Sequence, residues 1–118
     1  MGLDTFAAYS TEGYPAMPNE LFLDNDYLCG GVFSGGGASF RGKIYAEFIH
    51  AISGISLYQE VMQEPDIRNI LLALHNAIFV HDEGYDGEYR KISNEEIYAL
   101  YRWFNTVLRN KGVVLGWW

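Results

Sequence analysis

The sequence is poor in cysteine, in positive charge and in long apolar runs, and each shortage narrows the class of protein. Cys29 is the only cysteine among 118 residues, which excludes an intrachain disulfide and a zinc site built from several cysteines. A lone cysteine also favours a reducing compartment, so we expect a cytoplasmic location. No apolar run approaches the ~18 residues of a membrane span, and the first residues lack the pattern of a secretory signal. We therefore expect a soluble protein with no membrane partner.

Lys and Arg are outnumbered by Asp and Glu, eight against fifteen, which gives a net charge of −7. A chain with this charge repels polyanions, so we predict no nucleic-acid partner. The cations are also unevenly placed, because residues 1–40 contain none and only Arg41 and Lys43 precede Arg68. An anion that binds the first half of the chain must therefore be held by a local feature.

Apolar residues make up 49% of the chain and aromatic residues 16%, which argues against disorder. The length fits one domain with its own core, so we predict a single domain over residues 1–118. Nothing in the sequence indicates repeats or a linker.

The two ends of the chain have the pattern of strands. Residues 2–9 alternate, and residues 113–118 are rich in β-branched and aromatic side chains. We expect these two segments to pair, since pairing would anchor both termini. Residues 28–33 are a further candidate strand, and residues 10–26 form a loop with a helical turn near Glu20 to Leu23.

Three amphipathic helices are expected between the terminal strands. The first covers about residues 40–53, with Ser39 as its N-cap and Gly54 after its end. Its predicted buried stripe is Ile44, Phe48, Ala51 and Ile52, with Tyr45 and Ile49 at the edges. Residues 55–61 fit a short strand or a helical turn.

The second helix starts at Pro65, and the third has a capping-box pattern at Ser93 and Glu96. The predicted buried stripe of the second helix consists of Ile67, Ile70, Leu71, Leu74 and Ile78. The predicted buried stripe of the third helix consists of Ile97, Leu100, Tyr101, Phe104, Val107 and Leu108. We therefore predict an α+β fold with about three helices packed on one face of a small sheet that includes the N- and C-terminal strands.

A glycine-rich segment before the first helix is the strongest candidate site. Gly37, four further residues, Gly42 and Lys43 match most of the phosphate-binding pattern G-x-x-x-x-G-K-[ST], but Ile44 replaces the hydroxyl that would bind magnesium. A simpler anion site at a helix N-terminus is more plausible chemically, with phosphate or a nucleotide as the ligand. Its candidate ligand-binding residues are Gly35, Gly36, Gly37, Ser39, Arg41, Gly42 and Lys43. Alternatively, the glycines permit tight turns, and Arg41 and Lys43 pair with carboxylates.

Other chemistry-bearing residues give weaker patterns. The loop 80–92 resembles a calcium loop if Asp82 is its first position, but Gly84 and Ser93 stand where two ligands are needed, so a solvated acidic loop fits better. We predict no metal site, no cofactor and no catalytic constellation. Asp4 lies within an apolar strand and needs a partner, for which Arg41 is a candidate.

Three tryptophans indicate an interaction surface or ordinary core packing. Trp103 falls off the stripe of the third helix, and strand alternation would bury one of Trp117 and Trp118 and expose the other.

Several segments together resemble a group of small uncharacterised bacterial proteins. These segments are MGLDTFA, LCGG-x-FSGG with SFRGK-x-Y, SLYQE and the closing GWW. The resemblance spans most of the chain and implies that the glycine-rich segment and both termini are the family-like parts. It implies no activity, ligand or partner.

Three functions are compatible with these observations. The favoured one is a small non-enzymatic interaction or accessory protein that uses an aromatic patch for a protein partner or for a homo-oligomer. The alternatives are a binding module for a small anion at residues 35–43 and an enzyme of a type that leaves no sequence motif.

Overall fold

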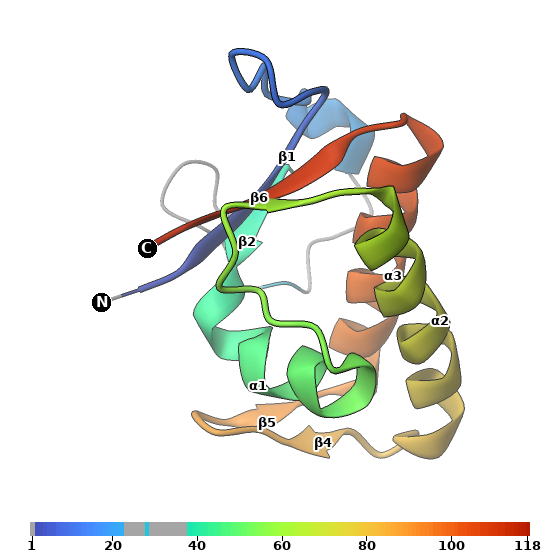
Figure 1. The fold of residues 1–118 in the computed structure, drawn as a ribbon. Coiled ribbons are helices and arrows are strands. Elements are labelled where there is room, and N and C mark those ends of the chain that lie inside the picture. Colours follow the sequence, from blue (N-terminus) through green and yellow to red (C-terminus); the bar gives the residue numbers. More distant parts are fainter. Residues whose placement is uncertain (1, 23–27, 29–37) are drawn as a thin grey trace.

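A four-stranded antiparallel sheet brings the two ends of the chain together (Figure 1). The computed structural model describes residues 2–22, 28 and 38–118. The central pair consists of β1 (Asp4–Ala8) and β6 (Val113–Trp117), and the edges are β2 (Ser39–Arg41) and β3 (Val61–Met62), in the order β2-β1-β6-β3. The predicted pairing of the terminal strands is confirmed, with a register that runs from Asp4 opposite Trp117 to Ala8 opposite Val113.

Three helices lie on one face of this sheet, as predicted. They are α1 (Gly42–Ser53), α2 (Glu64–Val80) and α3 (Asn94–Arg109). In Figure 1, α2 forms the right-hand flank of the molecule, away from β1 and β2. The α+β class predicted from the periodicity is therefore confirmed.

The second and third helices follow the sequence pattern closely. All five residues of the predicted α2 stripe are buried. The Ser93 hydroxyl accepts a hydrogen bond from the Glu96 backbone N–H, and the Glu96 carboxylate accepts one from the Ser93 backbone N–H. This reciprocal capping satisfies N–H groups that would otherwise lack a partner at the start of α3.

The first helix starts at Gly42, two residues later than predicted. Ser39 lies in β2, and Arg41 occupies the N-cap position, so the prediction of Ser39 as N-cap is wrong. Pairing with β1 holds residues 39–41 extended, and the helix begins at Gly42. A Cβ at Gly42 would lie 2.1 Å from the Thr5 hydroxyl oxygen, so this close approach requires glycine. Gly54 ends the helix with φ 75°, as expected.

The buried stripe of α1 is rotated relative to the prediction. Tyr45, Phe48 and Ile49 are fully buried, whereas Ala51 is exposed and Ile44 and Ile52 are half-buried. The physical reason is that α1 packs on more than the sheet. Tyr45 also reaches α3, where its hydroxyl bonds to a buried carboxylate.

Short elements complete the fold. A 3-10 helix, η1 (Asn19–Phe22), lies close to the predicted helical turn, and a two-stranded ribbon of β4 (Tyr85–Asp86) and β5 (Lys91–Ile92) fills the segment predicted as an acidic loop. Of residues 55–61, which were expected to form a short strand or a helical turn, only Val61 lies in a strand, where it begins β3. The candidate strand at residues 28–33 lies outside the described residues except for Leu28.

Trp103 is a core residue although it falls off the predicted stripe of the third helix, so core packing is the correct alternative for this tryptophan. It is fully buried, and its ring centroid lies 5.5 Å from that of Phe22 and 4.8 Å from that of Phe40. These two rings come from η1 and β2. They cover a flank of α3 that appears polar when the helix is considered alone.

The prediction that one of the two terminal tryptophans is buried is wrong. Trp117 is 59% exposed and Trp118 is 49% exposed. Both follow Val114 and Leu115, the buried residues of β6. The stability of the terminal strand therefore comes mainly from its backbone pairing and from Val114 and Leu115.

Trp103 and Trp118 should differ sharply when truncated. Trp103→Ala removes a buried aromatic ring and should lower the free energy of unfolding by about 3–5 kcal/mol. Trp118→Ala should cost less than about 1 kcal/mol, because the side chain is half exposed. Urea unfolding of the two variants measures both values, and similar losses would contradict this account of the core.

Candidate functional site

The predicted anion site is only partly within the described residues. Gly35, Gly36 and Gly37 lie outside them. Ser39 is buried in β2 opposite Phe6, and Arg41 ends the same strand opposite Asp4. Gly42 is buried as the first residue of α1, and Lys43 follows it. The structure thus brings Arg41, Gly42 and Lys43 to the start of a helix, as expected.

Both cations at this position already have neighbours. The Arg41 Nε atom lies 4.0 Å from the Asp4 carboxylate, which confirms Arg41 as the partner proposed for Asp4. The Lys43 Nζ atom lies 5.0 Å from the centre of the Tyr89 ring, a cation–π distance. The backbone N–H of Lys43 donates to the Leu3 carbonyl. These contacts reduce the positive potential available to an anion, and anion binding here stays a prediction.

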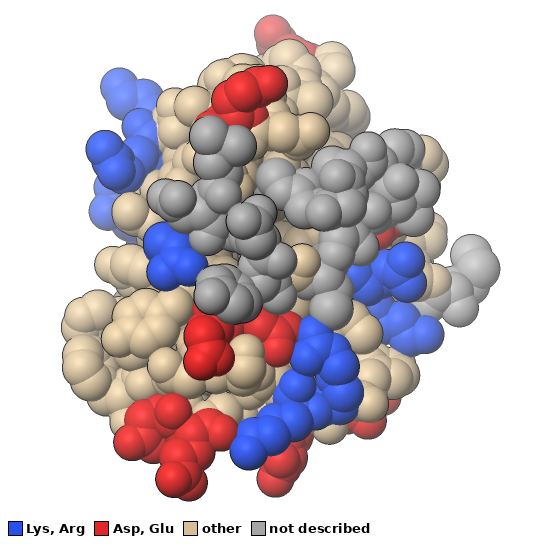
Figure 2. All heavy atoms as spheres, turned by 180° about the vertical axis from the view of Figure 1, so that it is seen from behind, with Lys and Arg blue, Asp and Glu red and all other residues tan. Residues whose placement is uncertain are grey.

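Charge on the surface is finely mixed. On the face shown in Figure 2, basic side chains form several small groups that alternate with acidic and uncharged ones.

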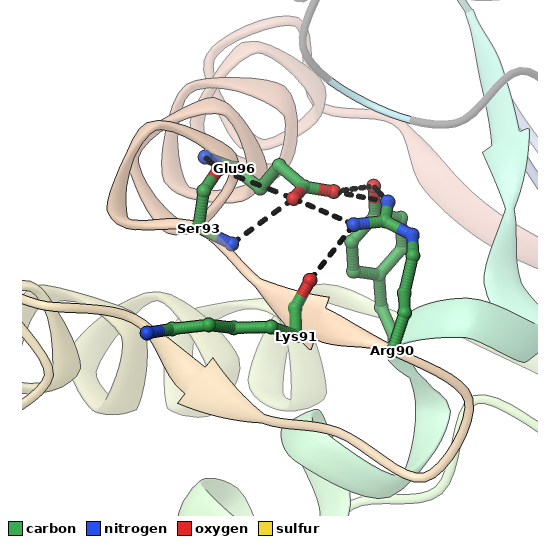
Figure 3. Close-up of polar contacts among 5 residues, drawn as sticks. Arg90, Lys91, Ser93 and Glu96 are labelled. Atoms are coloured by element: carbon green, nitrogen blue, oxygen red, sulfur yellow. Dashed lines mark hydrogen bonds and ion pairs between the residues drawn. The ribbon is translucent and has the colours of Figure 1, made fainter.

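The carboxylate of Glu96 is the centre of a buried polar cluster between α1, α3 and the β4–β5 ribbon (Figure 3). Its side chain is 7% exposed. The Arg90 guanidinium makes a bidentate contact with the Glu96 carboxylate, with Nη1 2.9 Å from Oε1 and Nη2 2.5 Å from Oε2. The Tyr45 hydroxyl donates to Oε2, and the Ser93 backbone N–H and hydroxyl donate to Oε1.

These donors determine the ionisation state of Glu96. Burial by itself would raise the pKa of the carboxyl, because it disfavours the charged form. The hydrogen bonds from Arg90, Ser93 and Tyr45 outweigh burial and lower the pKa of Glu96 below its ordinary value. Because both oxygens are already occupied, the geometry gives Glu96 the role of an anchor for the ribbon rather than that of a proton acceptor.

A second carboxylate fastens the other strand of the ribbon to α1. The Tyr85 hydroxyl donates to the Glu47 carboxylate at 2.6 Å, and this hydrogen bond raises the pKa of Tyr85. Across the described residues, no group of three or more His, Cys, Asp or Glu side chains is placed to hold a metal ion. Ser93, the last position of the calcium-loop alignment, is committed to capping α3.

The outer surface of α2 and α3 carries large side chains that are exposed to solvent. Leu72 is 72% exposed and Phe79 is 68% exposed, and they lie two helical turns apart on one side of α2. Between them, the His75 ring lies 5.6 Å from Phe79 and 6.1 Å from Tyr101 of α3, measured between centroids. Tyr98, one turn before Tyr101, is also exposed. We refer to the surface formed by Leu72, His75, Phe79, Tyr98 and Tyr101 as the α2–α3 face.

A groove of about 670 Å³ is lined by residues of β1, β2, β6 and the segment 16–20. Phe6, Met17 and Trp117 are among the apolar side chains that line it. Ala38, on its border, follows residues 29–37, which are outside the described part of the chain. We therefore base the functional proposal on the α2–α3 face, whose residues are all described.

Comparisons of the chain with protein-family models, with curated proteins and with solved structures gave no significant match. No helix among the described residues is both long and apolar enough to cross a membrane.

Some residues of these sites are predictable from the sequence, and others are not. The capping-box pattern identified Ser93 and Glu96, but Arg90 and Tyr45 were not linked to them, since these contacts depend on the ribbon and on the orientation of α1. Leu72 and Phe79 were also missed. Their signal was present in the sequence as large apolar residues on the side of the second helix opposite its buried stripe.

Glu96→Gln should destabilise the protein in a pH-dependent manner. A carboxyl whose folded-state pKa is lowered contributes stability above its unfolded pKa, and that stability is lost as the pH falls through the folded pKa. The free energy of unfolding should therefore fall by about 1–3 kcal/mol at pH 7, and the difference from wild type should shrink below about pH 4. Urea titrations from pH 7 to pH 3 measure it. Glu95→Gln, at the exposed neighbour, should have little effect, and a pH-independent difference for Glu96→Gln would contradict this assignment.

The predicted anion site is tested by thermal unfolding at low salt with phosphate, sulfate and a panel of nucleotides. A ligand at 100 times its dissociation constant adds about 2.7 kcal/mol of stability. If the site exists, Arg41→Ala should abolish the increase in melting temperature, whereas Arg109→Ala, at the far end of α3, should preserve it. If no anion changes the melting temperature of the wild type, there is no anion site, and the glycines serve only to form turns.

Proposed function

We propose that this protein is a small non-enzymatic interaction protein that binds a protein partner through the α2–α3 face. The observation that carries the proposal is the exposure of Leu72 and Phe79 on a well-formed helix whose opposite side is fully used by the core. A single exposed leucine is ordinary in a folded protein. A grouped set of large apolar and aromatic side chains on adjacent helices is typical of an interface.

The energetics favour burial of this face. Burying a leucine or phenylalanine side chain that is otherwise exposed contributes about 1.5–3 kcal/mol. Both side chains project from a regular helix, so little backbone ordering would be needed on binding. Tyrosines such as Tyr98 and Tyr101 provide contact area together with a hydroxyl for the polar rim, a combination common at interfaces.

The charge pattern limits the kind of partner. Between Asp66 and Asp82, α2 carries no carboxylate, although the chain as a whole has a net charge of −7. A basic partner would find no carboxylate to pair with in this stretch. A partner with a weakly charged apolar surface would bury apolar side chains against it. We therefore expect the partner to present apolar side chains of its own.

The cytoplasmic location expected from the lone Cys29 belongs to the same proposal. The anion-binding and enzymatic alternatives stay predictions, and no contact among the described residues favours either over the interaction protein.

Photo-crosslinking from within the α2–α3 face tests this function. Replacing Phe79 with p-benzoylphenylalanine and irradiating cells in which the protein is native should give one discrete covalent adduct. Adding Leu72→Glu to the same chain should abolish the adduct, because a buried charge opposes docking. The photoreactive residue remains in place in that variant.

The matched control carries p-benzoylphenylalanine at Tyr14, which is exposed on a different part of the molecule. It should not give the same adduct. If position 79 gives no adduct, or gives one that Leu72→Glu does not affect, the face is not an interaction surface and the proposed function is wrong.

A further inference from the structure

The exposed residues of α2 (Glu64–Val80) and of the turn that follows it have a spacing in the sequence that is symmetric about residues 75 and 76. Leu72 and Phe79 are the inner pair, and Arg68 and Glu83 lie four residues outside them on either side. The centre of both pairs falls between His75 and Asn76. The pattern therefore has a basic end, an apolar middle and an acidic end.

Such a pattern is self-complementary under a two-fold rotation. In an isologous dimer, if residue i contacts residue j of the partner, then j contacts i. Two antiparallel copies of α2 that cross at their centres would place each Leu72 against the other copy's Phe79. Each Arg68 would then face the acidic turn of Asp82 and Glu83 that follows the other helix. A parallel arrangement would instead bring Arg68 against Arg68.

The charged groups at the two ends are available for such contacts. The Arg68 side chain is 61% exposed, and its Nε atom lies 3.1 Å from the carboxylate of Glu64, which is on the same helix and is 60% exposed. Exposed pairs of this kind contribute little, so the guanidinium can be shared with a second carboxylate. Asp82 and Glu83 are both exposed in the turn after α2.

We propose that the partner of the α2–α3 face is a second copy of this chain, docked in an antiparallel two-fold arrangement through α2. This inference rests on the proposed function and specifies its partner. Net charges of −7 on both copies oppose association at long range. The carboxylate-free stretch between Asp66 and Asp82 removes this repulsion where the copies would meet, and the two symmetric Arg68–Glu83 contacts fix the direction of the helices.

Charge reversal tests the geometry by sedimentation velocity over a concentration series. Wild type should sediment at twice the mass of one chain. Arg68→Glu and Glu83→Arg should each weaken the dimer about tenfold or more, because each variant makes both symmetric contacts repulsive. A one-to-one mixture of the two variants should restore wild-type affinity, since every contact in that heterodimer again joins opposite charges.

The controls make the same charge changes elsewhere. Arg109→Glu and Glu12→Arg should leave the dimer intact. Glu83→Arg also lowers the negative charge of the chain, so general repulsion alone would predict a stronger dimer and not a weaker one. Melting temperatures close to that of wild type verify that each variant is folded.

Two results would overturn the inference, and they separate it from the proposed function. A wild-type protein that sediments as one chain at ~100 μM, while position 79 still crosslinks to a protein of another mass, refutes self-association but leaves the interaction function standing. A wild-type dimer that is indifferent to Leu72→Glu and to both charge reversals uses another surface, which refutes the inference, while the proposed function is still decided by the crosslink at position 79.

Discussion

The pairing of β1 with β6 is the constraint on which the rest of the structure depends. Five consecutive residues of each strand are in register, from Asp4 with Trp117 to Ala8 with Val113, so the sheet cannot form until both ends of the chain are present. Because β6 follows α3 after a short turn, this pairing fixes α3 against the sheet, and α2 then packs on α3 and α1. Among the described elements, none then covers the outer side of α2, and this arrangement exposes the apolar side chains there (Figure 1).

Local pattern predicted the features that depend on one segment. The terminal strands, the stripe of α2 and the capping box at Ser93 were all found from residue spacing. The errors arose where distant segments meet. Ser39 pairs with β1 in place of capping α1, and Trp103 is covered by rings from η1 and β2. The buried stripe of α1 is rotated relative to the prediction because the Tyr45 hydroxyl donates a hydrogen bond to Glu96 on α3. These two residues are far apart in the chain.

The two polar clusters and the apolar face have different roles. Glu96 and Glu47 anchor the β4–β5 ribbon, and both carboxylate oxygens of Glu96 accept hydrogen bonds in doing so. The sequence could indicate a role for Glu96 through the capping box, but not its hydrogen bond to Tyr45. The α2–α3 face, in contrast, has apolar side chains that contribute little to the isolated chain. Retaining Leu72 and Phe79 at exposed positions makes physical sense if another surface covers them.

An isotope-filtered nuclear Overhauser experiment tests the central claim most directly. One half of the sample carries ¹³C-labelled leucine and the other half is unlabelled. The account predicts intermolecular signals between the Leu72 methyl groups of one chain and the Phe79 ring protons of the other. It would be contradicted by signals between Leu72 and Leu72, which indicate parallel helices, or by the absence of any intermolecular signal from Leu72.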